Sequence, residues 1–298
     1  MSTTSSTHSS LDAYRTTASD APVSYSVYSA FSFYGARRGG ALPGPWLVAA
    51  LAALGHHEDA VRQTLYRMER SRELESATLG RTKLYRLSGF ARAEAGAGLA
   101  KIMDIPSRRW DGRWTLVQLQ PGTEGRVERE RLRSIAQAEG FAPVGPGLYA
   151  HPRDRAARLL EASAGLRPAD GPEVFRARRR GTDSDRAFVA RHWHLNDLAR
   201  RYRSFCRQFG PLARGPLPPP DVAFVVRFAV VFEFLEVGWN DPDLPPSLLP
   251  ASWPGLAARR LARTLYRRLL PGAIAFADDV LARVTARTRH VVSHPAAS

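Results

Sequence analysis

The chain has 298 residues, of which 44% are hydrophobic, and this length and composition predict two or three packed domains. Its formal net charge of +15 favours an acidic partner, such as nucleic acid, a phosphorylated ligand or a membrane surface. Cys206 is the single cysteine, which excludes an intramolecular disulfide and a thiolate-rich zinc site. No apolar run is long enough to span a bilayer, and no apolar signal core follows the polar start. We therefore expect a cytoplasmic protein that does not enter a membrane.

The positive charge is spread along the chain. The net charge is −1 over residues 1–22, +4 over 23–90, and +6 over each of 91–182 and 183–298. Charge alone therefore does not locate a binding site.

Residues 1–22 are polar and without periodicity, and we expect a mobile tail there.

A first folded unit is predicted over residues 23–90. It contains three short stretches in which apolar residues recur at positions i, i+4 and i+7, as expected for helices with one buried face. These are Val27, Phe31 and Tyr34; Leu47, Leu51 and Leu54; and Val61, Leu65 and Met68. Pro45 suits the start of the second helix, and Gly55 suits its end.

A hairpin is predicted after the third helix, because two strand-like runs flank Gly80 and Arg81. Three short helices followed by a two-stranded ribbon predict a winged helix-turn-helix, in which the third helix enters the major groove of DNA. Arginine suits guanine, glutamine suits adenine, and tyrosine can reach phosphate. The alternative is a solvated polar face on a small helical domain. The predicted DNA-binding residues are Arg62, Gln63, Thr64, Tyr66, Arg67, Arg81, Thr82 and Lys83.

A linker is predicted over residues 91–107, and a second unit over residues 108–182. The second unit has the order βαββαβ, which is the ferredoxin-like plan. Its first helix, over residues 124–139, is amphipathic. The residues expected on its inner face are Val127, Leu132, Ile135 and Ala136.

The third unit, residues 183–298, is predicted to be mainly helical. It opens with an apolar stripe of residues at helical spacing: Phe188, Leu195, Leu198, Tyr202, Phe205 and Phe209. A buried helix follows, with Glu233 and Glu236 embedded in it. A proline-rich extended loop over residues 240–255 and two closing helices complete the chain. The predicted fold class is therefore α+β, with a winged helix, a ferredoxin-like middle domain and a helical C-terminal domain.

Several local strings, taken in their order along the chain, resemble the PaaX family of bacterial transcriptional repressors. They are "GGALPGPWLVAALAALGHHEDAVRQTLYRM" and "GRTKLYRLS" in the first unit, "RRWDGRWTLVQLQPG" and "GFAPVGPGLYAHP" in the second, and "RYRSFC" and "DPDLPPSLLPASWPG" in the third. The resemblance covers about residues 25 to 285. It implies a homodimeric repressor that binds an inverted-repeat operator in double-stranded DNA and needs no cofactor.

The resemblance also implies a small-molecule effector, an acyl-coenzyme A thioester such as phenylacetyl-CoA, which releases the operator. The chain departs from the family at Phe232–Leu235, where a His-Glu-aromatic-Arg pattern is expected and "FEFL" stands instead. If this stretch lines the effector pocket, the departure makes the pocket less polar. The predicted effector-binding residues are Arg113, Glu233, Glu236 and Trp239.

Other groups have competing interpretations. The middle unit resembles the small nuclease of CRISPR adaptation, and Asp111 stands near the position of its metal-binding aspartate. A nuclease needs clustered carboxylates, however, so a salt-bridged or turn-capping Asp111 is favoured. His192 and His194 are at i, i+2, which does not place two imidazoles on one helical face for zinc. We expect His192 to be partly buried and His194 to be exposed.

Glu233 and Glu236, if buried as predicted, need partners for their carboxylates, because an unpaired charge is costly to bury. Arg227 is a candidate partner, and this structural interpretation is favoured over a ligand-binding or acid-base role. Cys206 is expected to be a buried small hydrophobe. The run "RARRR" at residues 176–180 is expected to be solvated, with phosphate binding as its alternative. Two rivals to the regulator stay open: an enzyme that uses these carboxylates, and an RNA-binding or nuclease protein.

Overall fold

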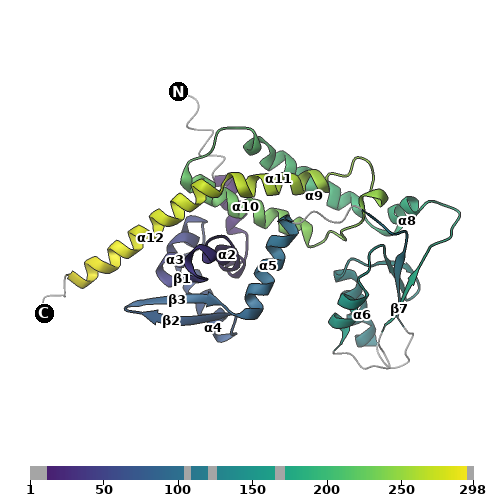
Figure 1. The fold of residues 1–298 in the computed structure, drawn as a ribbon, viewed down its shortest axis with the longest axis horizontal. Coiled ribbons are helices and arrows are strands. Elements are labelled where there is room, and N and C mark those ends of the chain that lie inside the picture. The colour runs from purple at the N-terminus through teal and green to yellow at the C-terminus, as the bar shows by residue number, and fades with distance from the viewer. Residues whose placement is uncertain (1–11, 104–108, 120–125, 165–171, 294–298) are drawn as a thin grey trace. The chain divides into compact units, whose positions relative to one another are not determined.

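A computed structural model describes residues 12–103, 109–119, 126–164 and 172–293. The chain divides into two compact units. Unit 1 joins both ends of the chain and comprises residues 1–104, 205–235 and 257–298. Unit 2 comprises residues 105–204 and 236–256. The structure is a mixture of helices and small antiparallel sheets, which confirms the predicted α+β class (Figure 1). In the described ranges, the helices are too short or too polar to cross a bilayer.

The N-terminal part of unit 1 follows the three-helix and hairpin pattern. Its helices and strands are α2 (Val23–Ala30), a π-helical turn (Phe31–Gly35), a 3-10 turn (Ala36–Arg38), β1 (Ala41–Pro43), α3 (Gly44–Ala53), α4 (Glu58–Arg70), β2 (Leu74–Leu79), β3 (Thr82–Leu87) and α5 (Gly89–Met103). The three strands form one antiparallel sheet in the order β1-β3-β2. The three predicted apolar faces are buried, which confirms the helical periodicity.

Local signals set the ends of α3 as predicted. Pro45 stands in its first turn, where a missing N–H breaks no hydrogen bond. The helix stops before Gly55, which has a φ of +103° that only glycine adopts readily. Strand β1 was not predicted from the sequence, in which "GGALPGP" indicated only a break. It forms because Ala41 and Leu42 pair with Arg86 and Tyr85 of β3.

The predicted mobile tail is wrong for residues 12–19, which are helical, while residues 1–11 lie outside the described ranges. Tyr14 stacks on Phe209 at 5.6 Å between ring centroids, and Ala18 is buried. These tertiary contacts hold the segment. They could not be predicted from its own sequence, which has no strong helical periodicity.

The C-terminal helices of unit 1 pack on its N-terminal helices. Helix α9 (Leu195–Phe209) ends in this unit, and α10 (Pro220–Gly238), α11 (Gly255–Arg268) and α12 (Leu270–Ser293) follow. Ring contacts join α10 to α2 and to the π-helical turn. They are Tyr25 to Phe232, Phe33 to Phe228, and Tyr34 to Phe224. The indole Nε1 of Trp46 in α3 also donates to the Ala277 carbonyl of α12 at 2.8 Å.

Four strands and two helices of unit 2 follow one another in the predicted βαββαβ order. They are β4 (Trp114–Gln118), α6 (Arg126–Ala138), β5 (Ala142–Gly145), β6 (Leu148–His151), α7 (Ala156–Ser163) and β7 (Glu173–Ala177). The strands are antiparallel, in the order β5-β6-β4-β7. Leu132 and Ala136 of α6 are buried and Ile135 is partly buried, as expected, whereas the Val127 side chain lies outside the described set.

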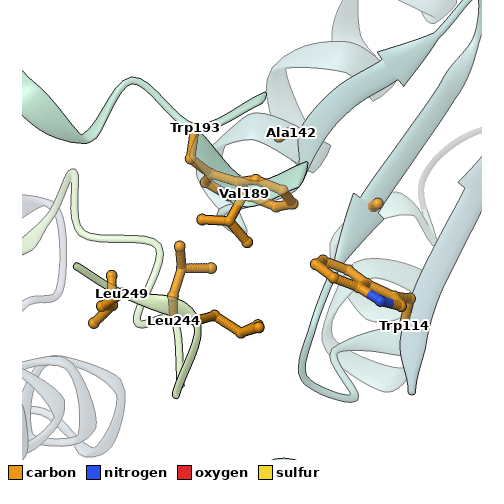
Figure 2. Packing of buried hydrophobic residues seen from close by; sticks show 8 residues of the cluster. Trp114, Ala142, Val189, Trp193, Leu244 and Leu249 are labelled. Carbon is orange, nitrogen blue, oxygen red and sulfur yellow. The ribbon is translucent and has the colours of Figure 1, made fainter. Parts of the chain in front are cut away.

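Alternate residues of β4 point to two different cores. Val117 packs with Leu132 of α6 and Leu159 of α7 on one face of the sheet. Trp114 points to the other face, where it meets Val189 of α8 (Asp185–His192) and Leu244 of the proline-rich loop (Figure 2). The loop therefore covers one face of a sheet, although its five prolines leave it only a short 3-10 turn, Pro246–Leu248.

A break separates α8 from α9. The sequence predicted one continuous stripe here, and this is wrong at Trp193, whose φ and ψ of −111° and 120° are extended. The indole of Trp193 is buried in the second core, and its Nε1 donates to the Gly140 carbonyl at 3.1 Å. Burial of this large ring outweighs the continuation of one helix.

Candidate nucleic-acid interface

Helix α4 separates an apolar face from a polar one. Val61, Leu65 and Met68 are buried against the rest of the domain. The side chains that point away from that core belong to residues with strong hydrogen-bonding or stacking groups: Arg62, Gln63, Tyr66 and Arg67. Tyr66 is 59% exposed, so most of its ring is accessible to a partner. These four side chains are exposed, so a flat or grooved partner can reach them.

Thr64, which was included among the predicted DNA contacts, is only 3% exposed. Its Oγ1 accepts a hydrogen bond from Nη2 of Arg67 at 3.0 Å. Thr64 therefore orients the Arg67 guanidinium and does not reach a duplex itself, so it is left out of the proposed contact set.

Arg62 is held by two carboxylates in the first turn of α4. Its Nη2 donates to Glu58 at 2.7 Å and its Nη1 donates to Asp59 at 3.0 Å. All three side chains are more than half exposed. Exposed ion pairs of this kind contribute little to stability, so a guanine or a phosphate can replace these carboxylates at little cost.

Arg70 extends the same face by one turn and was not among the predicted DNA contacts. Its guanidinium lies 5.9 Å from the ring centroid of Tyr66. The signal was available in the sequence, because residues four apart lie on one face of a helix. The pair places a cation over an exposed aromatic ring at the C-terminal end of α4.

The β2–β3 hairpin is tied to α4 by an ion pair. Nζ of Lys83 donates to Oε2 of Glu69 at 2.7 Å, and Oγ of Ser76 donates to Oε1 of the same carboxylate at 2.5 Å. The hydrogen bond from Lys83 is the main reason that the pKa of Glu69 is lowered. Arg81 is exposed at the tip of the hairpin, and Thr82 is partly buried beside it. The predicted turn at Gly80 and Arg81 is confirmed by the pairing of Leu79 with Thr82.

A groove of about 400 Å³ lies between the start of α3, the start of α4 and the hairpin, and Val284 of α12 also lines it. Arg62 and Lys83 both line it, with Glu58 as the acidic group on its wall. Gly44 allows this close approach, because a Cβ there would lie 3.0 Å from the ring of Tyr85. The outward face of α4, this groove with its two cations and the hairpin tip together form the surface that we call the α4–hairpin surface.

The four predicted effector residues do not belong to one compact unit. Glu233 belongs to unit 1, whereas Arg113, Glu236 and Trp239 belong to unit 2. The prediction that Glu236 is embedded is wrong, because its side chain is exposed at the end of an otherwise buried helix. Arg113 is exposed as well, and Trp239 is 50% exposed.

The predicted carboxylate partner of Arg227 is replaced by aromatic rings. Arg227 is 1% exposed, and its Nε donates to the Tyr266 carbonyl at 3.1 Å. The guanidinium carbon lies 3.9 Å from the ring centroid of Tyr266 and 4.4 Å from that of Phe33. Sequence alone could not reveal this arrangement, because the two rings come from distant parts of the chain.

The structure supports the structural interpretations of Asp111 and of the histidines. Asp111 accepts a hydrogen bond from the backbone N–H of Arg113 at 2.9 Å and pairs with Arg176 at 2.8 Å. His192 is partly buried against Phe188 and His194 is exposed, both as predicted. Across the described ranges, no three His, Cys, Asp or Glu side chains come together as a metal site.

Two further sequence predictions change in detail. In the "RARRR" run, Arg176 pairs with Asp111 and Arg179 pairs with Asp183, so the run is partly neutralised and not simply solvated. Cys206 is partly buried and not fully enclosed. Its partial burial raises the pKa of the thiol, which disfavours a reactive thiolate.

Comparison with known proteins gives three consecutive family matches. Residues 24–91 match the PaaX-like protein family, residues 107–189 match the PaaX protein central Cas2-like domain, and residues 193–279 match the PaaX-like protein C-terminal domain. The chain belongs to the PaaX family. Among relatives of known function, it is 31% identical over 266 residues to the transcriptional repressor PaaX of Escherichia coli (strain K12). That match covers 83% of this chain and 81% of the relative.

A solved structure has the same fold. It is the uncharacterized protein Rv0674 from Mycobacterium tuberculosis, with a TM-score of 0.52 and 24% sequence identity. The match covers 79% of this chain and 90% of that protein. The PaaX family resemblance predicted from the local strings is therefore confirmed over most of the chain.

Proposed function

We propose that this PaaX-family protein is a DNA-binding transcriptional regulator that acts as a repressor in the cytoplasm and is not an enzyme. The observation that carries the proposal is the α4–hairpin surface. A supported helix presents Arg62, Gln63, Tyr66 and Arg67 to the outside, and a hairpin tied to it presents Arg81 and Lys83. The 31% identical relative is named as a transcriptional repressor, which favours the same role here.

The proposed domain division follows the sequence prediction. Residues 23–90 form a winged helix-turn-helix, for which the β1-β3-β2 sheet and the helix before the hairpin are supporting features. Residues 108–182 form a ferredoxin-like middle domain, supported by the strand order β5-β6-β4-β7. Residues 91–107 link these two domains, and residues 183–298 form the mainly helical C-terminal domain.

In the proposed complex, α4 enters the major groove of double-stranded DNA. Arg62 and Arg67 each offer two donors to guanine O6 and N7, and Gln63 pairs with adenine. Tyr66 reaches a phosphate. At the flank, Arg81, Thr82 and Lys83 hold the phosphate backbone or the minor groove. Base contacts from α4 give sequence preference, and the hairpin gives affinity that depends on salt.

The proposed active form is a homodimer. Two copies of α4 would then read an inverted-repeat operator, with half-sites about 10 bp or a multiple of that distance apart. An acyl-CoA-type effector, the ligand class that the family resemblance implies, would release the operator. To do so, it must bind the DNA-free arrangement more tightly than the DNA-bound one.

The test is selection of bound duplexes from a random DNA pool with the full-length protein. The expected result is enrichment of one palindromic sequence, in which selection repeated with Arg62→Ala relaxes the preference at one position of each half-site. Arg133→Ala removes an exposed arginine of α6 outside the α4–hairpin surface, and this control should enrich the same palindrome. A wild-type protein that enriches no sequence would refute the proposal.

A further inference from the structure

A second cavity lies at the other end of the hairpin, in unit 1. Its volume is about 610 Å³, which is in the range of small-molecule sites. Three parts of the chain line it: the π-helical turn with the two glycines that follow, the base of the hairpin, and α5. Its apolar lining comes from Phe31 of the turn, Leu87 of β3 and Leu99 of α5.

Three charged side chains line the same cavity. They are Arg86 of β3, Arg92 of α5 and Glu75 of β2. Glu75 stands opposite Arg86 in the register of the two strands. Nη1 of Arg86 donates to the Gly39 carbonyl at 2.6 Å, so this guanidinium is held against another lining residue of the cavity. Within the described part of the chain, the side chain of Arg92 has neither an ion pair nor a hydrogen-bond partner. The cavity therefore combines apolar walls with one anchored and one free cation.

Gly39, Gly40 and Gly96 are among the residues that line the cavity. Gly39 and Gly40 have φ values of +62° and +80°, which other residues adopt rarely. Gly96 lies in the interior of α5, where glycine costs about 1 kcal/mol relative to alanine. A Cβ at Gly96 would meet nothing within 4 Å, so no crowding requires a glycine there. The residue is poor for the helix and leaves its wall of the cavity open.

We propose that this cavity binds an amphipathic organic anion, whose apolar group lies against Phe31 and Leu99 and whose anionic group lies between Arg86 and Arg92. Two guanidinium groups suit a carboxylate or a phosphate, which each can bind with paired hydrogen bonds. Glu75 disfavours a small, highly charged anion without an apolar body. A free organic acid and its coenzyme A thioester share the required chemistry.

The site is placed to act on the hairpin, and this step rests on the proposed regulatory function. Arg86 and Lys83 lie three residues apart on β3, or about 10 Å along the strand. Lys83 in turn pairs with Glu69 of α4. A ligand that draws Arg86 towards α5 and away from Gly39 moves the base of the same strand that carries the proposed phosphate contacts.

The test is calorimetric titration of the full-length protein without DNA. Phenylacetate, phenylacetyl-CoA and free coenzyme A are the three probes. If phenylacetate binds, its carboxylate is the group that lies between the two arginines. If only the thioester binds, the phosphates of its coenzyme A part are that group. Either result supports the site. No binding of either probe overturns the proposal. Free coenzyme A that binds as tightly as the thioester also overturns it, because the apolar contact would then contribute nothing.

Gly96→Leu should fill the cavity and weaken binding of the active probe at least tenfold. Ala93→Leu places the same side chain at an exposed position of α5 outside the cavity lining, and binding should be unchanged. Equal affinity in these two variants would contradict the proposed location. Arg92→Gln is a surface change that leaves folding intact, and it should weaken binding at least fivefold, whereas the exposed Arg260→Gln should not.

The same samples are tested for operator binding by fluorescence anisotropy. If the wild type binds the probe but no DNA sequence, the regulatory function fails while the ligand site stands. If it binds the operator but no probe, the ligand site fails while the regulatory function stands.

Discussion

Lys83 of the hairpin donates a hydrogen bond to Glu69 of α4, with 2.7 Å between Nζ and Oε2. The contact joins the two elements that are proposed to hold DNA. Lys83 also lies 5.3 Å from the ring centroid of Tyr85, so its position is fixed from two sides. Because the lysine and its carboxylate partner are both partly exposed, the pair adds little to stability. Its main consequence is to place one positive charge of the hairpin beside α4.

Lys83→Ala should weaken binding of all DNA sequences to a similar degree, because the lysine is expected to contact phosphate and not a base. The slope of log K against log salt should become less negative by about 1. Fluorescence anisotropy with a selected and an unrelated duplex measures both effects. Arg133→Ala removes an exposed charge from α6 and should change neither the affinity nor the slope.

Arg62→Ala should have a different effect, because its guanidinium is proposed to contact a base. We expect a loss of about 1–3 kcal/mol for the operator, a smaller loss for unrelated DNA, and a relaxed preference at one position of each half-site. Competition binding with single-substitution operators measures this pattern. A loss that is equal for every sequence would assign Arg62 to phosphate instead.

Much of the α4–hairpin surface could be predicted from the sequence, because its signals are local. Val61, Leu65 and Met68 set the buried face of α4, and Gly80 marks the turn of the hairpin. The prediction that Thr64 contacts DNA was wrong. Thr64 lies three residues after Val61, so it falls on the buried face of α4.

The features that were missed depend on contacts between distant segments. Residues 12–19 are helical where Tyr14 meets Phe209, and strand β1 exists through its pairing with β3. Trp193 interrupts a helical stripe because its ring fills a core built mostly from other parts of unit 2. A periodicity within one segment contains no information on such partners.

His151 should make the stability of unit 2 depend on pH. It is fully buried, accepts a hydrogen bond from the Arg153 N–H at its Nδ1, and donates from Nε2 to the Pro242 carbonyl at 2.9 Å. Burial lowers its pKa to about 4, from an unfolded value near 6.5. The unfolded state therefore binds the proton first, and the stabilisation that is complete above about pH 6.5 is lost as the pH falls towards 4.

Urea unfolding monitored by tryptophan fluorescence measures this effect. The free energy of unfolding should fall by about 2–3 kcal/mol between about pH 7 and pH 4.5 through this group. His151→Gln should remove that part of the fall, whereas the partly buried His192→Gln should retain it. An identical pH dependence in wild type and His151→Gln would contradict the assignment.

Arg227 should contribute to stability through its aromatic neighbours. Arg227→Ala leaves a cavity between Tyr266 and Phe33 and removes three cation–π contacts, the third with Tyr34, so we expect a loss of about 3 kcal/mol or more. Arg227→Met keeps the apolar part of the side chain and no longer buries a charge, so its cost should be smaller. The matched control is Arg260→Ala on the exposed side of α11, which should stay within about 0.5 kcal/mol of wild type. Chemical denaturation of the three variants gives the ranking.

The most direct test of the DNA-binding surface is the salt dependence of duplex binding. Wild-type protein and the Arg62→Ala/Gln63→Ala/Arg67→Ala variant are titrated with the selected operator and with an unrelated duplex, between about 50 and 200 mM salt. For the wild type, we predict a steep negative slope with both duplexes and a clear preference for the operator. For the variant, we predict that the preference is lost. A flat salt dependence in the wild type, or an unchanged operator preference in the triple variant, would show that the α4–hairpin surface does not read DNA.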